Sequence, residues 1–448
     1  LRATLLRLKG PDHADTLTVA HSLGVAYRAA GRWADAITLL EKVRDDRSRK
    51  LGPENSATLL TTAELAYAHQ LAGQLPAALA LFEKLLAVRT KQFGVDHHVT
   101  LTVMNNLAWA RFAAGQLPES LALHEETLQR RRTVLGPRHA QTLLSMNNVA
   151  RVLVAMRRGA DAQKQYEDCL VLRQAVLGPR HADTLITMSD LALLHQSAGR
   201  HAEAIQLLEQ VRTAREATLG AEHPDTLVTL VHLSRAYREH GQTEQGVAAL
   251  SAVLERVEKV GFQLGGVGPL IREATLVLEQ TGKMDQAETW QRKWLAVVKE
   301  KSGSESAAYA GELAALGLLL LKQEKWQEAE SVLRECQALR EKLQPELWTT
   351  FNSMSMLGHA LLGRASGMAD GAEKVSILAE AERLLTAGYE GMVAREKSIP
   401  ADFRVQRLGE ALERLILYCK QTGQLETAKK WEAAREALRA AGATPPAR

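Results

Sequence analysis

The sequence predicts an all-α fold, a superhelical solenoid built from tandem helix–turn–helix units. One glycine recurs at intervals of 42 residues through the first half of the chain. Between these glycines, apolar residues recur at positions i, i+3 and i+4, which is the spacing of one helix face. Alanine and leucine dominate while aromatic residues make up only 4% of the chain, which favours helix over strand. Repeated units of this kind stack into an elongated array.

The joint between successive units carries the most regular residues. Its glycines are Gly10, Gly52, Gly94, Gly136, Gly178 and Gly220. Three positions after each stands a polar residue: His13, Asn55, His97, His139, His181 and His223. A threonine followed by a leucine comes three positions later again, first as Thr16-Leu17. Because a reaction needs its catalytic group once, we expect these histidines to cap the next helix by accepting from its free backbone N–H groups.

Each unit is expected to hold two amphipathic helices. The first carries an apolar residue followed by a small one, Leu23-Gly24 in the first copy, and a glycine such as Gly31 then ends it. The second helix opens with an alanine on its inner face, as at Ala36. An arginine column follows on this helix: Arg47, Arg89, Arg131, Arg173 and Arg215. We expect this column to make contacts between repeats rather than to catalyse a reaction.

These patterns resemble the tetratricopeptide repeat. The residues that carry the resemblance are Leu23-Gly24, Tyr27, Ala36 and Leu40 in one copy, and Leu191-Ala192, Ala204 and Leu208 in another. The 42-residue period, with Leu219–Leu227 and Asn105–Ala108, looks like the kinesin-light-chain subtype. The resemblance implies a concave face, lined by the first helix of each pair, that binds protein or peptide partners.

The regularity of the repeats predicts the organisation of the chain. Residues 1–8 match the end of a preceding repeat, and residues 9–260 form six regular repeats. Residues 261–441 form about four divergent helix pairs, with an insertion near 364–377, and residues 442–448 form a tail. Polar residues on the last helix suit the end of a solenoid.

A partner-binding site is expected on the predicted concave face. Its candidate residues are Tyr67, Asn106, Trp109, Phe112, Asn148, Arg151, Asp190 and Arg235. Asparagine side chains offer donors and acceptors to an extended backbone, and tryptophan and arginine are typical interface anchors. The alternative, that these are ordinary solvated or inter-repeat residues, stays open.

Other kinds of site find little support. No phosphate-binding loop and no HExxH zinc motif is present, so we expect no catalytic, cofactor-binding or metal-binding residue and no small-molecule substrate. A net charge of +4 implies no nucleic-acid partner, and no apolar run is long enough for a membrane span. Cys169, Cys336 and Cys419 lie far apart, which fits a reducing, cytoplasmic location. A helical-repeat enzyme remains open; it would need unlike polar residues converging from different repeats.

The C-terminal part looks like the repeat region of planctomycete-type bacterial serine/threonine protein kinases. The segments that carry this resemblance are Trp348–Asn352, Ala387–Met392 and Arg407–Leu415. It implies that the chain is the C-terminal arm of a larger bacterial signalling protein. The alternative is a regulatory or substrate-recruiting region of a kinase, or of a signalling ATPase, whose catalytic domain lies upstream of Leu1.

Overall fold

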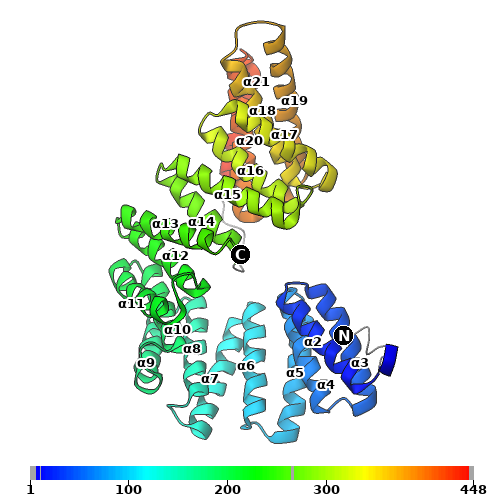
Figure 1. Cartoon of the computed structure of the whole chain (residues 1–448), viewed down its shortest axis with the longest axis vertical. Coiled ribbons are helices and arrows are strands. Elements are labelled where there is room, and N and C mark those ends of the chain that lie inside the picture. Colours follow the sequence, from blue (N-terminus) through cyan, green and yellow to red (C-terminus); the bar gives the residue numbers. More distant parts are fainter. Residues whose placement is uncertain (1–6, 11, 264–266, 443–448) are drawn as a thin grey trace. The chain divides into compact units, whose positions relative to one another are not determined.

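A computed structural model describes residues 7–10, 12–263 and 267–442 of the chain (Figure 1). These residues form helices, turns and loops, and none of them lies in a strand. The all-α solenoid predicted from the sequence is therefore confirmed. By packing, the chain divides into two compact units, residues 1–220 and 221–448. The sequence pattern predicts a boundary between regular and divergent repeats near residue 260. That boundary concerns the regularity of the sequence rather than packing, and it stays a prediction.

The first unit consists of five helix pairs of nearly constant size. The first helix of each pair has 16 residues and the second has 19. The helices are α2 (Ala14–Ala29), α3 (Trp33–Leu51), α4 (Ser56–Leu71), α5 (Leu75–Phe93), α6 (His98–Ala113), α7 (Leu117–Leu135), α8 (Ala140–Ala155), α9 (Gly159–Leu177), α10 (Ala182–Ser197) and α11 (His201–Leu219).

The second unit also consists of helix pairs, but their lengths vary. Its helices are α12 (Pro224–Glu239), α13 (Thr243–Lys259), α14 (Val267–Gln280), α15 (Met284–Ser302), α16 (Ala307–Lys322), α17 (Trp326–Leu343), α18 (Trp348–Ser366), α19 (Ala372–Ala394), the 3₁₀ helix η1 (Glu396–Ser398), α20 (Ala401–Gln421) and α21 (Leu425–Gly442). Most of the predicted insertion near 364–377 lies in the end of α18 and the start of α19.

The side chains at the histidine position of each joint cap the helix that follows, as predicted. In the joint before α8, His139 Nδ1 accepts from the N–H of Gln141 at 3.2 Å. Asn55 does the same before α4, where its Oδ1 accepts from the N–H of Ala57 at 2.9 Å. His13, His97, His181 and His223 make the equivalent bond. The predicted capping role is therefore confirmed, and Asn55 fills it as well as imidazole does.

Glycine and threonine complete the joint. Gly136 has φ 88°, a conformation that side-chain-bearing residues rarely adopt, and it ends α7. Its carbonyl oxygen accepts from the hydroxyl of Thr142, six residues later, at 2.8 Å. Thr58, Thr100 and Thr184 bond to their own glycines in the same way. The joints before α4, α6, α8 and α10 are thus each closed by one glycine, one cap and one threonine.

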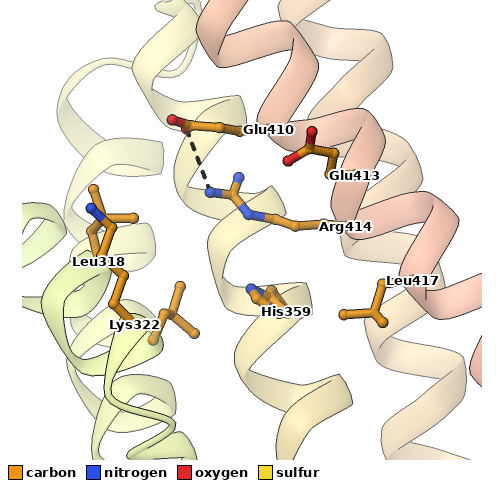
Figure 2. Close-up of a pocket in the computed structure, with 8 residues that line it drawn as sticks. Leu318, Lys322, His359, Glu410, Glu413, Arg414 and Leu417 are labelled. Atoms are coloured by element: carbon orange, nitrogen blue, oxygen red, sulfur yellow. Dashed lines mark ion pairs between the residues drawn. The ribbon is translucent and has the colours of Figure 1, made fainter. Parts of the chain in front are cut away.

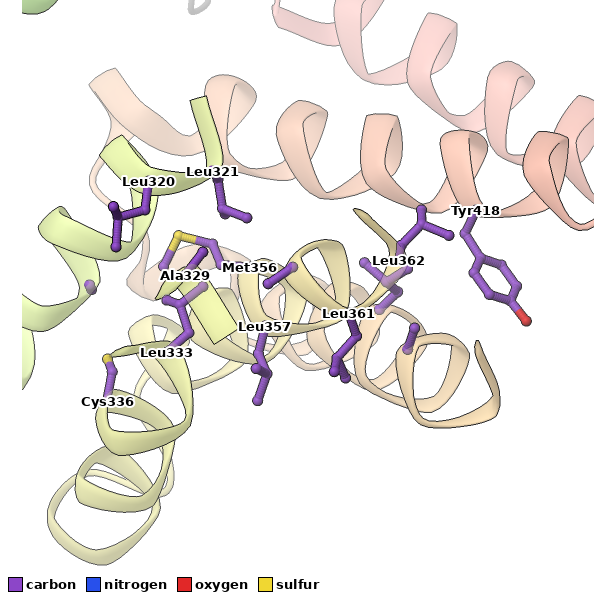
Figure 3. Packing of buried hydrophobic residues seen from close by; sticks show 14 of the residues in the cluster. Leu320, Leu321, Ala329, Leu333, Cys336, Met356, Leu357, Leu361, Leu362 and Tyr418 are labelled. Carbon is purple, nitrogen blue, oxygen red and sulfur yellow. The ribbon is translucent and has the colours of Figure 1, made fainter. Parts of the chain in front are cut away.

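Small residues let the two helices of a pair approach each other closely. A Cβ atom on Gly24 of α2 would lie 2.7 Å from the side chain of Leu40 on α3, so a larger residue would require Leu40 to shift. In the second unit, Gly317 of α16 stands in the same relation to Leu333 of α17. Leu333 belongs to the largest apolar cluster of this unit, shown in Figure 3. The core therefore runs between the helices of each pair and on to the next pair.

The arginine column links repeats through hydrogen bonds. Arg131 of α7 is buried, and its Nη1 donates to Ser145 Oγ at 2.8 Å on α8. Arg47 and Arg173 donate in the same way to Thr61 and Thr187. Each of these arginines therefore joins the second helix of one repeat to the first helix of the next, as the repeated position predicts.

Candidate protein-interaction face

One side of each first helix in residues 1–220 is left open to solvent. In α4 this side holds Leu60, Glu64, Tyr67 and Leu71, whereas Leu59, Leu65 and Ala66 are buried against neighbouring helices. We call this side, with the equivalent positions of α6, α8 and α10, the open face. In Figure 1, α8 and α10 lie on the inner side of the arc of this unit, and α9 and α11 lie on its outer side.

The predicted aromatic residues form two partly buried groups on the open face. Trp109 and Phe112 of α6 pack edge to face, with their ring centroids 5.2 Å apart. Tyr67 of α4 packs edge to face against Phe82 at 5.3 Å, and the Arg28 guanidinium lies 5.7 Å from its ring centroid. Burial raises the pKa of Tyr67 above its ordinary value, and the neighbouring Asn106 amide partly opposes this. These rings are held by packing and are partly exposed.

A buried histidine lies beneath the tryptophan. His124 of α7 is fully buried, and its ring centroid is 5.1 Å from that of Trp109. Neither of its ring nitrogens has a hydrogen-bond partner in the described part of the chain. Burial, with a smaller contribution from Arg131, lowers the pKa of His124 to about 4. The histidine is therefore neutral at physiological pH and supports Trp109 by packing.

The polar candidates mainly join neighbouring first helices. Arg151 of α8 donates to both carboxylate oxygens of Asp190 on α10, at 2.9 and 3.1 Å. Asn148, which is buried, donates to Asn105 Oδ1 at 2.7 Å. Asn147 also donates to Asp190, at 2.9 Å. The contacts of Asn148 and Asp190 are thus those of inter-repeat residues, the alternative that the sequence left open. Arg151 keeps 44% of its side chain exposed.

The remaining candidate, Arg235, lies on α12 and therefore belongs to the second unit. Its Nη2 donates to Glu273 Oε1 on α14 at 2.8 Å, and its side chain is 44% exposed. It therefore links two first helices of its own unit as Arg151 does in the first. The other seven candidate residues all belong to α4, α6, α8 and α10.

Sequence reasoning missed a column of exposed apolar residues. Leu60, Leu144 and Ile186 are 53%, 37% and 37% exposed, and they begin the open face of α4, α8 and α10. Thr102 is the equivalent residue of α6 and is also exposed. The signal was present in the sequence, because these residues recur every 42 positions and stand four before the Glu64 column on the same helix face. Exposed apolar side chains that repeat on one face, here interrupted by Thr102 on α6, are typical of an interaction surface.

The described residues offer little for other chemistry. They include no group of three or more histidine, cysteine, aspartate or glutamate side chains placed to hold a metal ion. Cys169, Cys336 and Cys419 are buried, and burial raises the pKa of each thiol, which disfavours the reactive thiolate. Within the same residues, no helix has the length and apolar character that a membrane crossing requires.

Comparisons with known families agree with this architecture. One family model described as tetratricopeptide repeat matches residues 56–133, 110–170, 141–217 and 192–259. Two further models with the same description match residues 16–57 and 312–346. No curated protein matches the chain. The predicted resemblance of the C-terminal part to kinase-associated repeats is not among these matches and stays a prediction.

Several solved structures are similar to parts of the chain. A kinesin light chain from Podosopora anserina with nearly identical TPR-like repeats is 30% identical, over 46% of this chain and 98% of that one, with a TM-score of 0.41. BtubC from P. vanneervenii is 17% identical, over 51% and 91%, with a TM-score of 0.44. The quorum sensor NprR from B. thuringiensis is 13% identical, over 71% and 87%, with a TM-score of 0.43. Because the repeat models together match more than half of its length, the chain belongs to the tetratricopeptide repeat family.

Proposed function

We propose that the chain is a protein-interaction scaffold that binds an extended segment of a protein partner along the open face of residues 1–220. Tetratricopeptide solenoids are typical interaction scaffolds, which supports the general role. The observation that carries the specific proposal is the set of exposed apolar side chains Leu60, Leu144 and Ile186 on the open face, which also holds the partly exposed Trp109 and Arg151.

The spacing of these side chains suggests the pattern of a matching partner. Successive first helices lie on the order of 10 Å apart, because packed helices are separated by about that distance. An extended or polyproline-type chain advances about 3.1–3.4 Å per residue, so three residues cover the same distance. A partner with an apolar residue at every third position would therefore place one apolar side chain on each repeat. Arg151, which keeps 44% of its side chain exposed, and the partly exposed Asn106 would bind its backbone or an acidic residue.

The test is selection of binding peptides from a random display library, followed by affinity measurement on purified variants of the full chain. The double variant L144E/I186E places charge at two of the exposed apolar positions, and should weaken binding at least about tenfold, or 1.4 kcal/mol. The matched control is V171E/V176E on α9, where both valines are exposed but lie on a second helix. The control should bind as the unmodified chain does.

Two outcomes would count against the proposal. Equal loss of affinity in both double variants would indicate a general effect of charge. Selected peptides that bind L144E/I186E as tightly as the unmodified chain would place the binding surface elsewhere.

We also propose a wider setting, which rests on sequence resemblance alone. The chain would be the cytoplasmic C-terminal arm of a larger bacterial signalling protein. The alternative is a regulatory or substrate-recruiting region of a serine/threonine kinase or signalling ATPase. The coding sequence upstream of Leu1 tests this directly: a kinase or ATPase domain in the same reading frame would support it, and its absence would contradict it.

A further inference from the structure

A pocket of about 280 Å³ lies in the second unit, and none of its lining residues belongs to the open face of residues 1–220. Three first helices, α16, α18 and α20, supply its walls (Figure 2). The lining residues are Leu318, Leu321, Lys322, His359, Glu410, Glu413, Arg414 and Leu417. Three leucines make much of this lining apolar, while Arg414 points between α16 and α18 from α20.

Arg414 is a buried cation with few partners. Its side chain is only 8% exposed, although a guanidinium carries five N–H donors. In the described part of the chain its one hydrogen bond is from Nη1 to Ser355 Oγ at 3.2 Å. The closest carboxylate oxygen, of Glu410, lies 3.7 Å from Nη2, beyond hydrogen-bond distance. Most of its donors are therefore left for another acceptor.

The other charged residues of the pocket are already paired. Glu410 accepts from Arg407 at 2.9 Å and also from Gln406 at 2.9 Å. Glu413 lies 3.6 Å from Arg439, and Lys322 donates to Glu279. Arg414 is thus the cation of this pocket with unused donors: its ion pair with Glu410 spans 3.7 Å, which is longer than a hydrogen bond, and its one hydrogen bond in the described part of the chain goes to Ser355. Burial lowers the pKa of Arg414 to about 10, so it stays protonated at neutral pH.

We propose that this pocket binds a single carboxylate that carries an apolar group of about the size of one amino-acid side chain. The carboxylate would accept hydrogen bonds from Arg414, as planar carboxylates do from guanidinium groups. The apolar group would contact Leu318, Leu321 and Leu417. The volume lies at the low end of the range for ligand pockets, which favours a small group.

The surroundings argue for a ligand with one negative charge. Glu410 and Glu413 lie at the pocket and would repel a dianion such as phosphate more strongly than a ligand with a single negative charge. Burial and the nearby Arg414 lower the pKa of His359 to about 4, so its ring adds no positive charge. The unused donors of Arg414 therefore suit one anionic group. This inference is independent of the proposed scaffold function, because it concerns other residues in the other unit.

The first experiment compares ligands that differ only in charge. N-acetyl-L-leucine and its neutral amide are titrated into the full chain, with binding followed by the NMR signals of the ligand. The acid should bind at least about tenfold more tightly than the amide, as expected for charge-assisted hydrogen bonds. Equal binding of acid and amide, or no binding of the acid at millimolar concentration, would overturn the proposal.

A second pair of ligands identifies the source of the carboxylate. A tripeptide ending in a free leucine carboxylate is compared with its C-terminal amide. Tighter binding of the acid tripeptide than of N-acetyl-L-leucine would support the pocket and assign it to a polypeptide C-terminus. Weaker binding, with N-acetyl-L-leucine still bound, would support it and assign the pocket to a free small carboxylate.

Variants then test the role of Arg414. Arg414→Met should reduce binding of the acid to the level of the amide, and circular dichroism checks that the variant is folded, because it removes one partner of the ion pair with Glu410. Arg404→Met, on the same helix but outside the pocket, is the matched control and should bind as the unmodified chain does. Leu417→Trp, at a position 38% exposed, narrows the pocket without removing the charge and should also weaken binding. Unchanged affinity in both Arg414→Met and Leu417→Trp would refute the site.

Discussion

Both units of the chain are built from helix pairs, but the pairs are uniform in the first unit and vary in the second. In residues 1–220 every first helix is capped by a histidine or asparagine side chain, and every pair has the same length. In residues 221–448 the described α-helices range from 14 to 23 residues, and Leu347, at the N-cap of α18, provides no side-chain cap. A strict repeat gives identical joints and a continuous open face. Loss of the repeat leaves room for groups that occur once, such as Arg414.

We expect core leucines to contribute equally to stability in the two units. Leu208 of α11 and Leu333 of α17 each stand four residues after a buried alanine and are each 0% exposed. Leu208→Ala and Leu333→Ala should each lower the free energy of unfolding by about 2–5 kcal/mol, since each leaves a cavity. Urea unfolding followed by circular dichroism measures the loss. A loss below about 1 kcal/mol for Leu333→Ala alone would show that the divergent unit packs differently.

His124 should lower the stability of the first unit, because the other repeats hold an apolar or aromatic residue at its position. Leu40, Phe82, Tyr166 and Leu208 occupy the equivalent position, so a histidine there leaves two buried nitrogens without partners. His124→Leu should raise the free energy of unfolding by about 1–3 kcal/mol at pH 7.

The same substitution should change the pH dependence of stability. The pKa of His124 is about 4 in the folded chain, below the ordinary 6.5, so the unfolded chain takes up the proton first as pH falls. The unmodified chain should therefore lose about 2 kcal/mol between pH 7 and pH 5 at this residue. Thermal unfolding at the two pH values measures this, and His124→Leu should abolish that part of the loss. An identical pH dependence in both proteins would contradict the prediction.

The caps should give the smallest effects and can be tested in both directions. His139→Ala should cost about 1 kcal/mol, whereas His139→Asn should cost only a few tenths, because Asn55 fills the same role. Leu347 has the same extended backbone as His139, with ψ 142° against 141°, but no capping side chain. Leu347→Asn should therefore stabilise the second unit by about 0.5–1 kcal/mol in chemical denaturation. A loss of stability would show that the exposed leucine has another role.

Repetition explains which parts of the fold could be predicted. The joint histidines, the arginine column and the small residues at helix crossings each occur several times, so their role can be separated from chance. Leu60, Leu144 and Ile186 repeat as well, but an apolar residue is expected to be buried until packing shows otherwise. Arg414 has no such signal, because its surroundings come from three helices that are far apart in sequence. The binding role of the open face is still a prediction.

The joints make the length of the first unit modular. The joint before α8 is closed by bonds among Gly136, His139, Gln141 and Thr142, all within seven consecutive residues. Deleting or duplicating 42 consecutive residues inside residues 9–220 therefore rejoins equivalent positions and preserves a complete joint on both sides. A chain built in this way can gain or lose a whole helix pair without any new loop having to be invented. The reach of the open face is thus adjustable in steps of one repeat.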